Sequence, residues 1–140
     1  MSIWGFSDLL PPLDEAHRIT LGEGNTPLVR SRRIGPSIGM DRLYFKLETG
    51  NPTGSYKDRF AACGVSHALA LGKRAILATS SGNSGSALAA YCAAAQLPCC
   101  LAIVETAPEV KLRQMLAYGA SLFRIRRFGP DPHFTQEIVD

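Results

Sequence analysis

The sequence lacks the patterns that mark several common protein classes. Its four cysteines form no CxxC pair, and its three histidines do not stand at the spacing of metal ligands. No apolar stretch approaches the roughly 18 residues of a membrane span, and no basic segment precedes an apolar run at the N-terminus. We therefore expect a chain without a metal site, a membrane segment or an export signal, in a reduced, cytoplasmic setting.

Charge is scarce as well. Only 19% of the 140 residues are charged, and the formal net charge is +3, a surplus too small to indicate nucleic-acid binding but compatible with an anionic small molecule. Nucleotide-binding loops are also missing, because Gly22-x-Gly24 lacks the third glycine of the dinucleotide fingerprint and no GxxxxGK(S/T) occurs. What remains is the composition of a globular chain, with 46% hydrophobic residues and enough length for one domain with a core.

Apolar runs alternate with turn signals from residue 43 onward. Strands are predicted at residues 43–47, 75–79, 99–104 and 122–125, and helices at residues 57–71, from Asn83 or Ser84 to Gln96, and from a Thr106/Glu109 capping box to Tyr118. A turn at residues 129–132 and the start of another helix before Asp140 complete the pattern. Strands that are separated by single helices are parallel through right-handed crossovers. We therefore predict an α/β fold, an open and mostly parallel sheet with helices on both faces, with ligands at the carboxyl ends of the strands.

The first polar loop of interest follows the predicted strand at residues 43–47. It reads Asn51-Pro52-Thr53-Gly54-Ser55-Tyr56-Lys57-Asp58-Arg59 and places Lys57 at the start of a helix. The unpaired N–H groups there make a positive environment, which favours the neutral amine that attacks a carbonyl. A solvated lysine near a helix start gives the same local pattern, so this loop alone does not identify a nucleophile.

The second polar loop, Ser80-Ser81-Gly82-Asn83-Ser84-Gly85, ends the predicted strand at residues 75–79. Hydroxyl and amide groups cluster there at a helix N-terminus, and the glycines let the backbone approach a ligand. This arrangement suits a carboxylate or a phosphate. A plain helix cap explains the same residues, because serine and asparagine are favoured at that position.

Three segments taken together resemble fold-type II pyridoxal-phosphate enzymes, and among them the threonine synthases. Gly22-Glu23-Gly24-Asn25-Thr26-Pro27-Leu28 resembles the N-terminal GEG-x-TPL segment of that family. The loop from Asn51 to Arg59 resembles its lysine motif, and the loop from Ser80 to Gly85 resembles its S-x-GN-x-G loop. The segments occur in the family's order and at suitable intervals, so the combination is more specific than any one of them.

The resemblance implies a pyridoxal 5'-phosphate cofactor and assigns roles to individual residues. Lys57 would hold the cofactor covalently and move protons during catalysis, and Asn83 would hydrogen-bond the ring hydroxyl of the cofactor. Ser80, Ser81 and Ser84 would line the place of the substrate carboxylate. The implied reaction is that of threonine synthase, a lyase of threonine biosynthesis that converts O-phosphohomoserine and water to threonine and phosphate. The implied partners are a phosphorylated amino-acid substrate and a second copy of the full-length enzyme in a homodimer, without nucleic acid or membrane.

The resemblance also implies a part that lies elsewhere. In the family, the loop for the cofactor phosphate and the group that meets the pyridine nitrogen come later in the chain, and nothing after Asn83 supplies either. Residues 1–140 are therefore interpreted as the single N-terminal portion of a longer enzyme, a fragment without the second, phosphate-loop domain and without strong activity alone. Two alternatives stay open: another amino-acid lyase of this fold, such as a serine/threonine dehydratase or a cysteate-synthase-like enzyme, and a non-catalytic truncated remnant that binds a partner.

Overall fold

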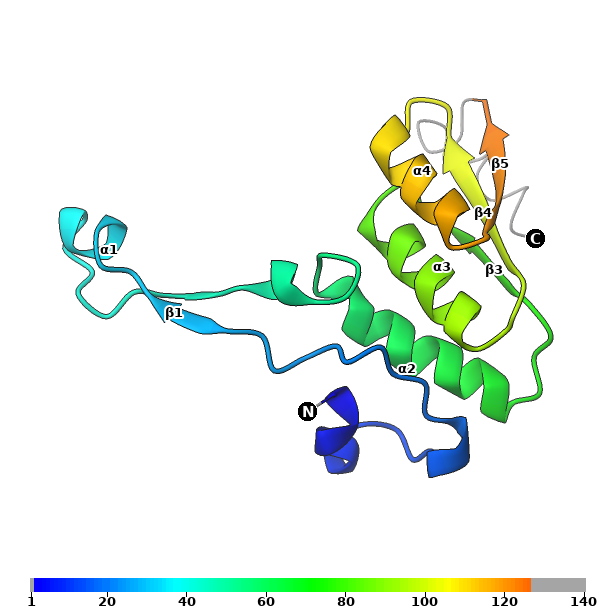
Figure 1. The fold of residues 1–140 in the computed structure, drawn as a ribbon, viewed down its shortest axis with the longest axis horizontal. Helices are drawn as coiled ribbons and strands as arrows, with labels where there is room; N and C mark the ends of the chain where they lie inside the picture. The colour runs from blue at the N-terminus through cyan, green and yellow to red at the C-terminus, as the bar shows by residue number, and fades with distance from the viewer. Residues whose placement is uncertain (1, 127–140) are drawn as a thin grey trace.

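The structure, a computed structural model, describes residues 2–126 and has a parallel sheet at its centre. The strand order is β3-β4-β5, formed by β3 (Ile76–Thr79), β4 (Cys99–Val104) and β5 (Ser121–Ile125). The helices α3 (Asn83–Ala94) and α4 (Glu109–Ala117) pack on the sheet, and α2 (Lys57–Ala70) packs on α3 (Figure 1). These six elements lie where the sequence predicts them, to within a few residues at each end.

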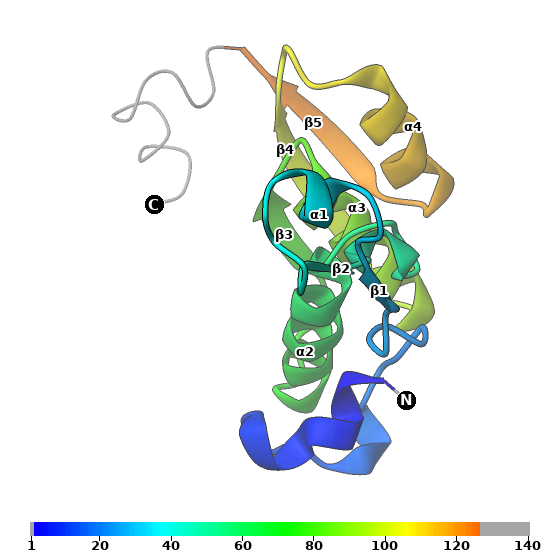
Figure 2. The same cartoon turned by 90° about the vertical axis from the view of Figure 1, so that its left-hand side faces the viewer.

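Helical crossovers make this sheet parallel. Ala78 of β3 stands opposite Leu101 of β4, which stands opposite Leu122 of β5. Both crossovers step in the same direction across the sheet, so right-handed connections place α3 and α4 on the same face (Figures 1 and 2). The α/β class and the parallel sheet are thus confirmed. The helices expected on the second face are not found within residues 2–126, where Leu77 and Phe123 are exposed.

Helix α3 is the centre of the core. It is buried from Gly85 to Cys92, as its nearly all-apolar sequence predicts. α2 and α4 pack against it from opposite sides (Figure 1), and the small residues Ala61 and Ala62 of α2 are fully buried. The packing of these three helices fixes the ends of α2 and α3 relative to each other.

The strand predicted at residues 43–47 is present as β2 (Tyr44–Lys46), but the prediction that it is parallel to the others is wrong. It pairs antiparallel with β1 (Leu28–Arg30), a strand that the sequence pattern did not indicate. The link between the two carries only α1 (Ile34–Ser37), which is too short for a parallel crossover. The resulting ribbon extends from the body as an arm, with every residue of both strands exposed (Figure 1).

The start of α4 also differs from its prediction. The expected capping box of Thr106 and Glu109 is wrong, because Pro108 is the capping residue and no side chain bonds the helix start. Thr106 stands two residues before the cap, so its hydroxyl is not at the capping position. The predicted end is confirmed: Tyr118 closes the helix and Gly119 follows with φ +83°, a left-handed conformation that favours glycine.

The N-terminal segment has no long helix, as its prolines predict. It forms the short 3-10 helices η1 (Ile3–Leu9) and η2 (Glu15–His17), of which η2 packs on α2. Across residues 2–126, no helix is long and apolar enough to cross a lipid bilayer. The turn predicted at residues 129–132 and the helix before Asp140 lie outside the described residues.

Candidate active site

Lys57 is the first residue of α2 and follows residues 51–56, here called the lysine loop. The buried carboxylate of Asp58 closes this loop by accepting hydrogen bonds from the Thr53 amide at 3.0 Å and the Thr53 hydroxyl at 2.7 Å. Gly54 has φ +85°, which a residue with a side chain adopts only under strain. A tight turn therefore fixes the backbone just before Lys57.

The Lys57 amine is available for chemistry. Its nitrogen lies 4.7 Å from the centre of the Tyr56 ring, a cation–π contact with a side chain that is 57% exposed. The amine makes no hydrogen bond or ion pair within residues 2–126. Because an exposed contact of this kind contributes only about 0.5–1 kcal/mol, a reacting aldehyde can draw the amine away from Tyr56.

A carboxylate outside the predicted site, that of Glu48 in η3 (Glu48–Gly50), connects the lysine loop with its neighbours. It accepts hydrogen bonds from the Thr26 hydroxyl at 2.8 Å and the Asn51 side-chain amide at 2.9 Å. Arg59 binds it through Nε at 3.1 Å and Nη2 at 3.0 Å. Hydrogen bonding to Arg59 is the main cause that lowers the pKa of Glu48 from 4.5 to about 2. Three of these residues lie in the motifs of the resemblance, but Glu48 lies between motifs and gave no signal of its own.

Two of the predicted serines shape residues 80–85, here called the serine loop. The Ser80 hydroxyl oxygen accepts hydrogen bonds from the Gly82 amide at 3.3 Å and the Gly85 amide at 2.9 Å. The Ser81 oxygen accepts a hydrogen bond from the Val104 amide at 3.4 Å. A hydroxyl that accepts in this way still has a proton to donate, so both serines keep a donor for a ligand.

The other predicted residues, Asn83 and Ser84, open α3. Gly82 is the capping residue of this helix, so the predicted cap by Asn83 or Ser84 is wrong. Neither side chain forms a hydrogen bond within the described part of the chain, and Asn83 is exposed. A capping role would have engaged these side chains with the helix, so its absence leaves them available to a ligand.

Backbone geometry makes the serine loop open on one side and tight on the other. A Cβ at Gly82 would meet no atom within 4 Å, so the backbone there is open to an incoming group. A Cβ at Gly85 would lie 2.6 Å from the Ser80 carbonyl oxygen and 2.8 Å from Met115 Cε, so this glycine lets the loop fold closely onto α4. A free amine and a free side-chain amide beside such a loop fit a cofactor that carries an aldehyde and a hydroxyl.

The lysine loop and the serine loop lie at the same end of two adjacent helices. α2 and α3 pack side by side, and Figure 1 shows both beginning at the end of the body that faces the arm. A hydrogen bond of 3.4 Å from Gln114 of α4 to the Thr53 carbonyl ties the lysine loop to the same group of helices. Lys57 and Asn83, the first residues of these two helices, therefore lie at the end of the body that faces the arm.

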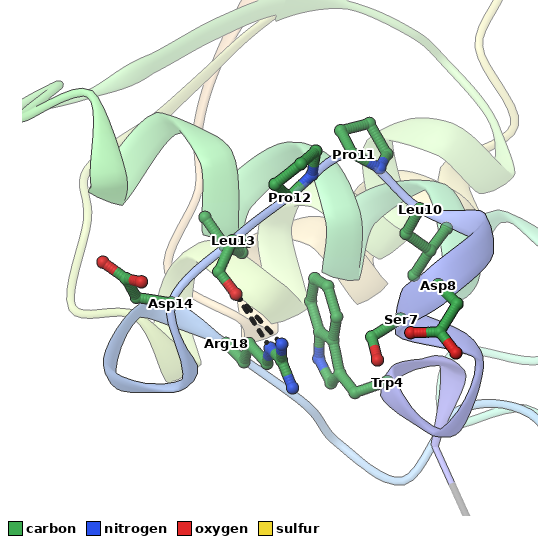
Figure 3. A pocket seen from close by; sticks show the side chains of 9 residues that line it. All are labelled: Trp4, Ser7, Asp8, Leu10, Pro11, Pro12, Leu13, Asp14 and Arg18. Carbon is green, nitrogen blue, oxygen red and sulfur yellow. Dashed lines mark hydrogen bonds between the residues drawn. The ribbon is translucent and has the colours of Figure 1, made fainter.

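A separate cavity of 430 Å³ lies in the N-terminal segment (Figure 3). In it the Arg18 guanidinium lies 5.6 Å from the centre of the Trp4 ring, and its Nε and Nη2 atoms each donate a hydrogen bond to the Leu13 carbonyl. The cavity is lined by neither Lys57 nor any residue of the serine loop. It is therefore not part of the site that the two loops form.

Sequence comparison relates the chain to enzymes that use pyridoxal phosphate. A family model described as "Pyridoxal-phosphate dependent enzyme" matches residues 19–139. The chain is 41% identical over 128 residues to a threonine synthase from Methanosarcina acetivorans, which covers 89% of this chain and 31% of that protein. It is 40% identical over 122 residues to a threonine synthase from Halalkalibacterium halodurans, a match that covers 86% of this chain and 34% of that protein. The chain thus spans about a third of the length of these curated relatives.

Comparison with solved structures gives the same assignment. A pyridoxal 5'-phosphate-dependent aspartate racemase superposes with a TM-score of 0.71 at 33% identity, over 81% of this chain and 36% of that one. Maize serine racemase has a TM-score of 0.71 at 23% identity, and the superposition covers 83% of this chain and 35% of that one. This likeness concerns the fold alone. The predicted fold type is confirmed by these neighbours. Since the family model covers most of the sequence, the chain belongs to the pyridoxal-phosphate dependent enzymes.

Proposed function

We propose that the protein is a lyase of the threonine-synthase type, which converts O-phosphohomoserine and water to threonine and phosphate. The observation that carries this proposal is the free amine of Lys57 at the same end of the body as the serine loop, in a chain 41% identical to a threonine synthase. Because the chain spans about a third of such relatives, the proposal concerns the whole enzyme, in which a second domain supplies the loop for the cofactor phosphate.

The proposed roles of the residues are those that the family resemblance implies, and the positions of the two loops support them. When bound, pyridoxal phosphate supplies a ring that withdraws the charge left after the substrate loses its α-proton. Lys57 would hold the cofactor through its aldehyde, and the Lys57 amine would accept the α-proton of the substrate and return it. The side-chain amide of Asn83 would hydrogen-bond the ring hydroxyl and keep the ring in one orientation. The hydroxyls of Ser80, Ser81 and Ser84 and the N–H groups at the start of α3 bind the substrate carboxylate.

A second candidate is another reaction of the same fold, such as the dehydration of serine or threonine, or a cysteate-synthase-like replacement of phosphate. The likeness to an aspartate racemase at 33% identity favours it, because there this fold serves a different reaction on an amino acid. The two candidates share Lys57 and differ in the group that leaves the substrate.

The test is a substrate comparison with the longest protein that contains this sequence. O-phosphohomoserine is expected to yield threonine and phosphate in equal amounts, whereas serine, threonine and O-phosphoserine are expected to react poorly. Lys57→Ala is expected to abolish turnover, and Lys73→Ala, which replaces an exposed lysine beyond the end of α2, to leave it unchanged. Turnover of the other amino acids with none of O-phosphohomoserine would favour the second candidate. Turnover that survives Lys57→Ala would contradict both.

A further inference from the structure

Glu48 joins three segments of the chain that meet beside Lys57. We propose that Glu48 is a positioning residue, whose carboxylate holds the lysine loop and the first turn of α2 in the geometry that presents Lys57 to the cofactor. This inference rests on the proposed role of Lys57 and adds a residue that no motif of the resemblance contains.

The partners of Glu48 come from separate parts of the chain. Thr26 precedes β1, Asn51 begins the lysine loop, and Arg59 lies two residues after Lys57 in the first turn of α2. Thr26 and Asn51 are only 6% and 4% exposed, so water has little access to replace a lost hydrogen bond at either. One carboxylate therefore fixes the strand segment, the loop and the helix start against one another.

The bonds to Glu48 are of a strong kind. Arg59 donates two of them to the ionised carboxylate, and charge-assisted bonds with this two-point geometry are about twice as strong as neutral ones. Asn51 extends the network, because its side-chain oxygen accepts a 2.9 Å hydrogen bond from the Gly24 amide. Without the carboxylate, Thr26 and Asn51 would each keep a buried donor with no acceptor, and Arg59 would lose the acceptor of two charged hydrogen bonds.

Asp58, the second carboxylate near Lys57, has a different role from Glu48. Asp58 bonds the amide and hydroxyl of Thr53, so it shapes the lysine loop from within. Glu48 instead connects the loop to segments outside it. A substitution at Glu48 is thus expected to leave the local turn formed and to let the loop and the start of α2 move relative to the rest of the body.

The test compares the full 140-residue chain with its Glu48→Gln and Glu48→Asp forms. Glu109→Gln is the matched control, because Glu109 also accepts from an arginine, Arg113, at 2.8 Å, but in a pair whose side chains are more than two-thirds exposed. The first measurement is amide hydrogen exchange by mass spectrometry. The second is the rate at which pyridoxal phosphate and borohydride label Lys57, divided by the rate at the exposed Lys73.

In the Glu48→Gln form, the rate of amide hydrogen exchange in residues 51–59 is expected to rise about tenfold, while the rate in α3 stays unchanged. The Lys57-to-Lys73 labelling ratio is expected to fall by a similar factor of about ten, and Glu48→Asp is expected to restore part of both. Glu109→Gln is expected to change neither measurement.

Three outcomes would overturn the inference. They are unchanged exchange in residues 51–59, an equal rise of exchange in α3, or faster loop exchange with an unchanged labelling ratio. If Lys57 is not labelled above Lys73 in the unsubstituted chain, residues 1–140 alone do not present Lys57 to the aldehyde, and the proposed function is then decided by Lys57→Ala in the whole enzyme. The exchange measurement then still decides whether Glu48 orders the loop, because it needs no cofactor.

Discussion

The Tyr91 phenol, buried in α3, donates a 2.8 Å hydrogen bond to the carboxylate of Glu23 in the N-terminal segment. Glu23 has no exposed surface and also accepts hydrogen bonds from the Ile3 amide, the Thr20 hydroxyl and the Leu21 amide. Burial is the main cause that raises the pKa of Tyr91 above its usual value, so the phenol stays protonated and remains a donor. This bond anchors the irregular N-terminal segment to the central helix.

Tyr91→Phe is expected to lower the free energy of unfolding by about 1–3 kcal/mol, because it removes a donor from a buried carboxylate. Urea unfolding followed by circular dichroism measures this change. Tyr118→Phe is the control, since the Tyr118 hydroxyl has no hydrogen bond within residues 2–126. An equal loss of stability in both variants would show that the Glu23 bond contributes nothing specific.

Gly85→Ala is expected to destabilise the chain by about 1–3 kcal/mol, because the added Cβ would overlap the Ser80 carbonyl oxygen. Gly64→Ala makes the same chemical change inside α2, where a Cβ would meet no atom within 4 Å. There alanine is expected to stabilise the helix by about 0.5–1 kcal/mol. Thermal unfolding of both variants measures these two changes in stability, which are expected to have opposite signs. A Gly85→Ala chain that is as stable as the unsubstituted chain, or more stable, would contradict the tight packing of the serine loop.

Because of Glu48, the free energy of unfolding is expected to decrease at acidic pH. Its pKa is about 2 in the folded chain against an ordinary value of 4.5, chiefly because of the Arg59 hydrogen bonds. As the pH falls, the unfolded chain binds the proton first, so the contribution of Glu48 is complete above its unfolded pKa and is lost toward the folded one.

Urea unfolding of the unsubstituted and Glu48→Gln chains at several pH values measures this dependence. Their difference in unfolding free energy is expected to stay constant from about pH 7 to about pH 5 and to shrink at about pH 3. A difference that is the same at about pH 3 as at neutral pH would contradict the depressed pKa.

Local sequence patterns were sufficient to predict the body of the fold. β4 has the predicted bounds, and α2 begins at Lys57 as predicted, because apolar runs and flanking glycines determine these elements locally. The lysine and serine loops could be found in the same way, since their glycines and hydroxyls are unusual at helix starts.

Long-range pairing could not be predicted. The antiparallel partner of β2 is a three-residue strand, too short to show a pattern of alternating polarity. Glu48 is one acid among many in the sequence, and it differs from the others only in the folded chain, where Thr26 and Arg59 meet it. The predicted N-terminal caps of α3 and α4 were wrong for a related reason, because several adjacent residues can cap a helix and packing decides which one does.

The most direct test of the central claim is to find which lysine binds the cofactor. The 140-residue chain is mixed with pyridoxal phosphate and reduced with borohydride, and the modified lysine is located by mass spectrometry. We expect selective labelling of Lys57 over Lys46, Lys73 and Lys111, because the folded lysine loop presents the Lys57 amine at the start of α2. Labelling spread evenly over all lysines, or absent from Lys57, would contradict this expectation.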